Sequence, residues 1–208
     1  REGFIVVYPD GYDRHWNDCR ASADYAANLE NVDDVQFVTQ MLNWFSANYS
    51  VNTKRIYATG YSNGGHLSFR LAMETPELIA AIAPIAANLP VADNFDCNQL
   101  GQAVSVAIFN GTADAFNPYE GGLVSILGNE SRGTVLSSKA TIDYWLQMAN
   151  YSNRQGIKKY LDDSEPRDGS TVEKSTWQWG NGPEVSLYTL HGAGHTIPSK
   201  LVRLGGLF

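Results

Sequence analysis

Hydrophobic positions along the chain fall first into short, uninterrupted runs. Residues 4–8 form a continuous apolar run that ends at a Pro-Asp-Gly turn, as is typical of a buried parallel strand. Shorter runs occupy residues 55–59 and 103–109, and the later part of residues 79–87 has the same character. These segments predict four buried strands.

Longer stretches show the spacing of amphipathic helices. From Asn31 to Phe45, apolar residues recur at intervals of three and four, which places them on one face of a helix. Residues 64–73 and 135–148 can form two further helices, each next to a predicted strand. Helices therefore separate most of the predicted strands.

The end of the chain has a different pattern. Residues 172–179 and 185–190 flank a Gly-Asn-Gly-Pro turn and predict a hairpin. Strands and helices alternate through most of the rest, which predicts an α/β fold with a mostly parallel sheet and helices on both faces. We find no repeat or linker, and expect one domain over residues 1–208.

Composition and charge narrow the function classes. The chain is 43% hydrophobic and 18% charged, as a globular protein is, and its net charge is -7. An acidic protein lacks the basic surface that nucleic acid or anionic lipid would need, so we expect neither partner. No apolar run approaches the roughly 20 residues that span a bilayer.

The sequence Gly-Tyr-Ser-Asn-Gly-Gly at residues 60–65 lies between a predicted strand and a predicted helix. A Gly-x-Ser-x-Gly motif in this context predicts a nucleophile elbow, with glycines where side chains would clash. Such a turn exposes the hydroxyl of Ser62 and directs the backbone N–H of Asn63 toward an oxyanion. An ordinary glycine-rich turn is the alternative.

A serine nucleophile needs a general base, and the chain contains four histidines. His195 lies in a Gly-rich loop directly after the last predicted strand, where it can fold back over the elbow. His191, nearer the strand end, is the second candidate. His66 and His15 are interpreted as structural or substrate-side residues.

The base needs a carboxylate that fixes its tautomer. Asp114 follows the predicted strand at residues 103–109 through a short turn, which puts it at the same sheet edge as Ser62. A plain turn-forming aspartate is the alternative. The order Ser62, Asp114, His195 is the order of α/β-hydrolases.

Two cysteines, Cys19 and Cys97, allow a single intramolecular pairing. Both stand among loop-type residues, which favours a disulfide over two free thiols. In the chain-entropy model a bridge over this span stabilises by roughly 4–5 kcal/mol. A disulfide would indicate an oxidising compartment. Neither cysteine belongs to a closely spaced ligand set, so we expect no metal site.

Five segments carry a resemblance to a known family: Tyr-Pro-Asp-Gly, His-Trp-Asn-Asp-Cys, Gly-Tyr-Ser-Asn-Gly-Gly, Asn-Gly-Thr-Ala-Asp and Gly-Ala-Gly-His-Thr. They resemble the polyhydroxybutyrate depolymerase and feruloyl esterase group, carbohydrate esterase family 1. The resemblance implies a secreted serine esterase without a cofactor, acting on short acyl, hydroxycinnamoyl or hydroxyalkanoate esters of small molecules or polymers. It supports Ser62, Asp114 and His195, and we expect Trp16 and Tyr61 to contact the substrate.

The chain also departs from that family. Ala115 and Ile197 stand where proline and an aromatic residue are common, which leaves the substrate open. In the family, an upstream strand lies between the strands at residues 4–8 and 55–59, and its loop supplies a second oxyanion donor. We therefore expect an N-terminally incomplete domain. The two strands could pair directly, recruit a strand from another chain, or enclose one from an upstream segment.

Other functions remain open at this point. The same three residues could serve a peptidase or an acyltransferase. The chain could also be an inactive module that binds carbohydrate or polymer. Partitioning of the acyl-enzyme between water and another acceptor would separate the enzyme classes, and labelling with an active-serine phosphonate would separate an enzyme from an inactive module.

Overall fold

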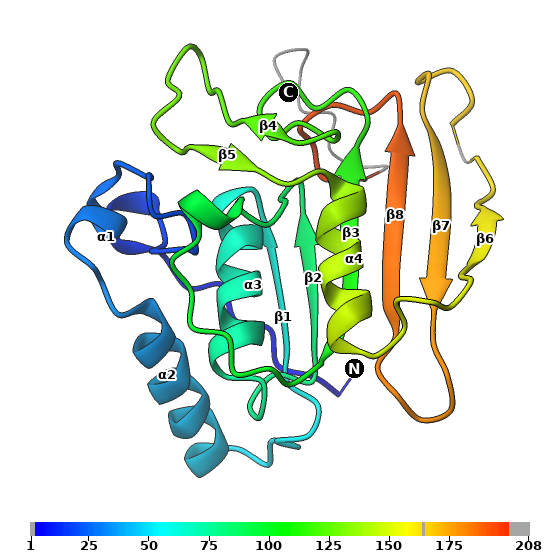
Figure 1. Cartoon of the computed structure of the whole chain (residues 1–208). Helices are drawn as coiled ribbons and strands as arrows, with labels where there is room; N and C mark the ends of the chain where they lie inside the picture. Colours follow the sequence, from blue (N-terminus) through cyan, green and yellow to red (C-terminus); the bar gives the residue numbers. More distant parts are fainter. Residues whose placement is uncertain (1–2, 164, 200–208) are drawn as a thin grey trace.

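A six-stranded sheet runs through the molecule in a computed structural model that describes residues 3–163 and 165–199 (Figure 1). Its strand order is β1-β2-β3-β8-β7-β6. The first four strands of that order are parallel, and β7 and β6 continue the sheet in antiparallel pairing. The strands are β1 (Tyr57–Tyr61), β2 (Ala81–Ile85), β3 (Ser105–Gly111), β8 (Val185–His191), β7 (Thr171–Trp177) and β6 (Ile157–Tyr160).

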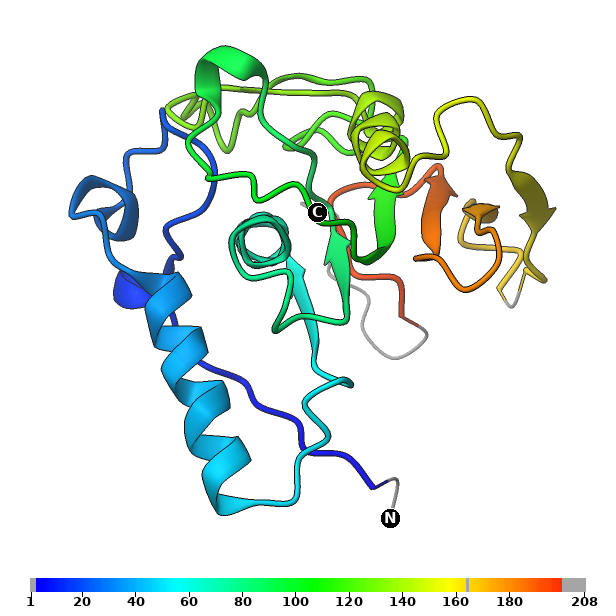
Figure 2. The same ribbon diagram turned by 60° about the horizontal axis from the view of Figure 1, so that its bottom comes forward.

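The helices cover the sheet unequally. Figure 2 shows α3 and α4 on the same face, while α2 lies beyond the β1 edge, where it contacts α3. No helix among the described residues is long and apolar enough to cross a membrane. The helices are α1 (Ala26–Leu29), α2 (Asp34–Asn48), α3 (Asn63–Glu74) and α4 (Ser138–Met148); 3-10 turns span Tyr12–Arg14 and Ala92–Asn94, and a small pair of strands joins β4 (Gly122–Leu123) and β5 (Thr134–Val135).

Side-chain caps fix where two helices begin. The Asp33 carboxylate accepts the N–H of Gln36 at 2.8 Å, so α2 starts three residues later than the periodicity from Asn31 suggests. The Ser137 hydroxyl accepts the N–H of Ala140 at 3.0 Å and starts α4. The predicted helix at residues 135–148 therefore begins too early, because residue 135 belongs to β5.

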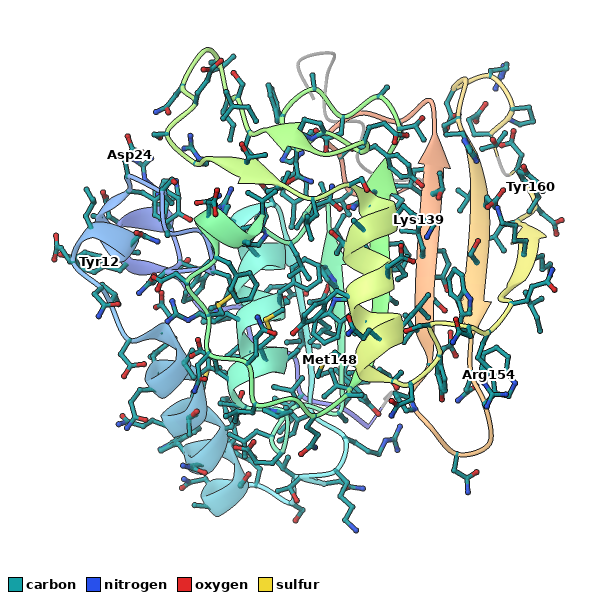
Figure 3. The ribbon with its side chains drawn as sticks, in the orientation of Figure 1. Tyr12, Asp24, Lys139, Met148, Arg154 and Tyr160 are labelled. Carbon is teal, nitrogen blue, oxygen red and sulfur yellow. A yellow bond between two sulfur atoms is a disulfide. The ribbon has the colours of Figure 1, made fainter. Side chains whose placement is uncertain are left out.

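The core lies between the sheet and these two helices. Ile82, Val106 and Ile108 are almost fully buried, and the rings of Phe69 on α3 and Trp145 on α4 stack at 6.0 Å. Figure 3, in which Lys139 and Met148 mark the ends of α4, shows the side chains that fill this layer. The opposite sheet face carries half-buried side chains, among them Ala83, Ile85, Ala107 and Phe109. The predicted α/β fold with a mostly parallel sheet is confirmed. Helices were expected on both faces of the sheet, whereas α3 and α4, the described helices that pack on it, lie on the same face.

The strand predicted at residues 4–8 is wrong. This segment has no regular secondary structure, and its exposed fraction reaches 70% at Phe4 and 89% at Tyr8. An apolar run becomes a strand only where a neighbouring strand satisfies its backbone groups. Within the described residues no strand pairs with the outer edge of β1, and Figure 2 shows this segment running apart from it. The further strand expected between the two segments stays a prediction.

The C-terminal hairpin is confirmed as the antiparallel pair β7 and β8, and sequence reasoning missed its neighbour β6. All four residues of β6 are exposed, and two of them are Lys158 and Lys159. Such an edge strand has no hydrophobic alternation to detect, and its lysines are typical of edges that resist further pairing.

Candidate active site

The turn from β1 to α3 has the geometry of a nucleophile elbow. Ser62 has backbone angles φ 54° and ψ -117°, a conformation that residues other than glycine rarely adopt. A Cβ at Gly60 would lie 2.2 Å from the backbone of Gly64, and one at Gly65 would lie 2.9 Å from the Ala87 side chain. A Cβ at Gly64 would meet nothing within 4 Å, so the steric role expected there belongs to Gly65 instead.

Ser62 is the N-cap residue of α3, yet its hydroxyl makes no capping hydrogen bond. Its backbone N–H instead donates to the Ile85 carbonyl of β2 at 2.8 Å, which ties the turn to the sheet. Asn63 is the first helical residue, where backbone N–H groups have no partner within the helix. The Ser62 hydroxyl, which does not cap the helix, therefore lies beside an N–H at the positive end of the helix dipole.

Asp114 and His195 form a buried pair above the sheet. The Nδ1–Oδ2 distance is 2.7 Å, and the two residues are 7% and 5% exposed. The other carboxylate oxygen of Asp114 accepts the N–H groups of Phe116 and Asn117 at 2.9 and 2.8 Å. A carboxylate only accepts hydrogen bonds, so Nδ1 of His195 carries the hydrogen and Nε2 is left as an acceptor.

The loops that carry these two side chains are hydrogen-bonded to each other. The N–H of Ala113 donates to the Ala193 carbonyl at 2.9 Å, and the N–H of Gly192 donates to the Thr112 hydroxyl at 2.9 Å. A Cβ at Gly111 would lie 2.3 Å from the Ala193 carbonyl oxygen. Glycine at the end of β3 thus permits the close approach that brings Asp114 to His195.

Ser62 and His195 line one cavity of about 80 Å³. Within the described part of the chain the Ser62 hydroxyl has no hydrogen bond, which suits a nucleophile whose contact with its base tightens when substrate binds. The other lining residues are His15, Arg20, Asn63, His66, Phe116, Asn117, Val124, Ile126 and Arg132.

Several of these lining residues were not found from the sequence. For Phe116 and Asn117, the only signal in the sequence was that they closely follow Asp114. Val124, Ile126 and Arg132 come from the irregular segment beyond them. His15 and His66 were interpreted as structural or substrate-side, and both line the cavity. Burial, with the nearby Arg20 guanidinium, lowers the pKa of His66 to about 3, so its ring is neutral at pH 7.

The two residues expected to contact substrate lie elsewhere in the site. Tyr61 does not line the cavity; its hydroxyl donates to the His195 carbonyl at 2.8 Å. Burial and the Asp114 carboxylate raise the pKa of this hydroxyl to about 12. Trp16 packs against the core, and its ring stacks on that of Phe37 with a centroid distance of 6.4 Å. The backbone N–H and carbonyl of Trp16 are hydrogen-bonded to the side-chain amide of Asn63. Their substrate contacts stay predictions.

The second histidine candidate is separate from the pair. His191 ends β8, its ring stacks with Tyr160 at 6.4 Å, and it does not line the cavity. Among the described residues no three His, Cys, Asp or Glu side chains could share a metal ion. The structure contains the Cys19–Cys97 disulfide, so that prediction is confirmed.

Comparison with known sequences gives the chain its family. The profile of the dienelactone hydrolase family matches residues 1–120, more than half of the chain. The chain belongs to the dienelactone hydrolase family. The matched residues include Ser62 and Asp114, and the loop of His195 lies beyond them.

Relatives of this chain include proteins named as members of the esterase and depolymerase group that the five sequence segments resemble. Feruloyl esterase B of Piromyces equi is 28% identical over 93% of the chain and 34% of its own length. Poly(3-hydroxyalkanoate) depolymerase C of Paucimonas lemoignei is 25% identical over 94% of the chain and 48% of its own length. The chain spans about half the length of the curated relatives it matches. The resemblance to this esterase and depolymerase group is confirmed.

A solved structure agrees on the fold. The acetyl xylan esterase from Aspergillus awamori aligns with 91% of this chain and 71% of its own, with a TM-score of 0.51 and 14% identity. At that identity the likeness shows the α/β-hydrolase fold alone.

Proposed function

We propose that this protein is a serine carboxylic ester hydrolase in which Ser62 is the nucleophile, His195 the base and Asp114 the acid. The observation that carries the proposal is the buried 2.7 Å contact between His195 Nδ1 and Asp114 Oδ2, in a cavity that Ser62 also lines. Relatives that are named as esterases support the same reaction class.

In the acylation step, Ser62 Oγ attacks the ester carbonyl while His195 Nε2 takes its proton. Asp114 holds the ring in the required tautomer and stabilises the imidazolium. Negative charge develops on the carbonyl oxygen, and the N–H of Asn63 donates to it in this proposal. The alcohol then leaves with the proton from His195, and an acyl-serine remains.

Deacylation repeats these roles with water. His195 removes a proton from a water molecule, whose oxygen attacks the acyl carbon, and returns the proton to Ser62. The products are the carboxylic acid and the regenerated serine. Transfer to water defines the hydrolase, whereas transfer to another acceptor would define an acyltransferase.

The cavity favours a short acyl group. A cavity of about 80 Å³ has room for about five to eight water molecules, since each needs roughly 10–15 Å³ of such space. Phe116, Val124 and Ile126 give it apolar walls. A two-carbon acyl group fits there, whereas a hydroxycinnamoyl group would extend beyond it. We propose acetyl esters as the preferred class.

The disulfide supports a location outside the cytoplasm. Disulfides persist in oxidising compartments, and Cys19 and Cys97 are 78 positions apart and fully committed to the bridge. We therefore propose that the protein is secreted or otherwise extracytoplasmic.

The test combines labelling with kinetics. A fluorophosphonate should modify the wild-type protein once, and peptide mapping should find the modification on Ser62. The Ser62→Ala variant should not be labelled and should lose at least about 10³-fold in turnover of aryl acetate. Hydrolysis of aryl acetate should exceed that of a methyl hydroxycinnamate.

The opposite results have defined meanings. An unlabelled wild-type protein that binds xylan or polyester would instead indicate a binding module. Label on another serine, or a Ser62→Ala variant with a tenth of the wild-type rate, would overturn the assignment of the nucleophile.

A further inference from the structure

The side chain of Asn63, next to the nucleophile, is bonded entirely to a loop that precedes it by about forty residues. Its Oδ1 accepts the N–H of Trp16 at 2.7 Å, and its Nδ2 donates to the Trp16 carbonyl at 3.0 Å. The second hydrogen of the same NH2 group is shared between Asp18 Oδ2 at 2.7 Å and the Tyr25 hydroxyl at 3.0 Å. These contacts therefore fix the side chain of the residue whose backbone N–H is the proposed oxyanion donor.

The partners of Asn63 form a buried charged cluster. Asp18 is 0% exposed and Arg20 is 3% exposed; Arg20 Nη2 donates to Asp18 Oδ2 at 2.6 Å and Nε donates to Oδ1 at 3.0 Å. The Tyr25 hydroxyl donates to Asp18 and accepts from Arg20 Nη2 at 3.1 Å. Burial alone would raise the pKa of Asp18, but Arg20 and these hydrogen bonds hold it well below its usual range.

A buried ion pair is weak evidence for stability, because desolvation offsets much of the attraction. Such a cluster is better explained by what it holds in place. Here Asp18 holds the amide of Asn63, and Arg20 neutralises a carboxylate charge that would otherwise oppose an oxyanion nearby. The Cys19–Cys97 disulfide joins the same loop to the segment after β2.

From these contacts we infer that Asp18 is a positioning residue, which acts with Arg20 and Tyr25 through Asn63 to aim its backbone N–H at the oxyanion. This inference rests on the proposed esterase function. Asp18 and Tyr25 do not line the cavity of Ser62, whereas Arg20 does. The cluster sets the orientation of the first turn of α3, and an error of about 1 Å in such a group can cost on the order of 100-fold in rate.

The decisive experiment compares turnover with binding in Asp18→Asn and Asn63→Ala. We expect kcat for aryl acetate to fall by about 10- to 100-fold, with KM nearly unchanged, because the lost orientation matters only when the oxyanion forms. The inhibition constant of an alkyl boronic acid, which forms a tetrahedral anion on serine, should rise in the same proportion. A purely structural role would lower melting temperature without this split.

A charge exchange adds a rescue test. Asn63→Asp alone places two carboxylates together and should be the slowest variant. Adding Asp18→Asn to Asn63→Asp restores one carboxylate and one amide, and should recover at least about tenfold in kcat. Tyr25→Phe keeps the ring and should cost about three- to tenfold, which provides a milder variant should Asp18→Asn unfold.

Tyr144→Phe is the matched control for Tyr25→Phe, since its hydroxyl bonds Gln99 at 3.1 Å, away from the cavity, and it should leave kcat unchanged. If the wild-type enzyme is active and labelled on Ser62, but Asn63→Ala, Asn63→Asp and Tyr25→Phe all keep wild-type kcat, the positioning role is wrong. A wild-type protein with neither hydrolysis nor label would overturn the proposed function itself, and this inference with it.

Discussion

The β3–β8 region and the β1 edge of the sheet differ in how far their side chains are buried and in how their loops are hydrogen-bonded. At the β3 and β8 ends, the loops of Asp114 and His195 exchange hydrogen bonds with each other and bury both side chains. At the β1 side, residues 4–8 are exposed, and α2 presents Phe37 and Trp44 with 45% and 55% of their surface exposed.

This difference indicates which part of the fold sets the geometry of the candidate site. The Asp114–His195 contact depends on loops that leave adjacent strands in the middle of the sheet. From the β1 side it receives the Tyr61 hydroxyl, which donates to the His195 carbonyl. The elbow lies between the two regions, because Ser62 follows β1 while its N–H is bonded to Ile85 of β2. We expect perturbations of the first region to affect chemistry strongly and perturbations of the second to matter much less.

Apart from the loss of the nucleophile itself in Ser62→Ala, the largest expected effect is on the acid. Asp114→Asn keeps the shape but presents an amide to His195 Nδ1, which allows the wrong tautomer. Turnover of aryl acetate should fall by about 10⁴-fold with little change in the melting temperature. The matched control is Asp93→Asn, on the exposed turn Ala92–Asn94, which should keep full activity. A fall of less than tenfold in Asp114→Asn would mean that the contact is structural.

Much of this well-held region could be predicted from the sequence. The elbow, the acid turn and the histidine loop each carry a local pattern of glycines next to an apolar run, and chain order then relates them. The apolar runs predicted where the parallel strands lie. The strand predicted at residues 55–59 is two residues too early, because β1 spans Tyr57–Tyr61.

What the sequence could not give depends on contacts between distant segments. The exposure of residues 4–8 follows from which strand pairs with which, and an apolar run carries no record of its partner. The contacts of Trp16 and Tyr61 depend on the fold of the loops around them, as does the cavity segment that includes Arg132. Hydrophobic periodicity reports which face is buried, but not what covers it.

The next largest effect is on stability. The Cys19–Cys97 disulfide closes a span of 78 positions and fastens the loop that holds Asn63. The double variant Cys19→Ser, Cys97→Ser should lose about 2–5 kcal/mol of unfolding free energy, measured by denaturant titration. Reductant should lower the melting temperature of the wild-type protein and leave that of the double variant unchanged. Equal stability of the two proteins would contradict the prediction.

A smaller effect is expected where the two well-held loops meet. Gly111→Ala places a methyl group 2.3 Å from the Ala193 carbonyl oxygen, so the histidine loop must move. We expect kcat to fall by about 10- to 100-fold, measured with aryl acetate. Gly101→Ala is the control, because it adds a methyl group at φ +76° in open space, which affects stability but not the site. Equal activities would show that the loop approach is not required.

The smallest effect is expected on the exposed side and tests the comparison most directly. Val6 is 53% exposed and Val106 on β3 is 2% exposed, so the same change to alanine samples both regions. Val106→Ala removes two buried methyl groups and should cost about 2–3 kcal/mol of unfolding free energy. Val6→Ala should stay within about 0.5 kcal/mol of wild type, as substitutions at exposed positions do. If Val6→Ala costs as much as Val106→Ala in denaturant titrations, residues 4–8 are buried in solution, and the β1 side is as well packed as the side that holds Asp114 and His195.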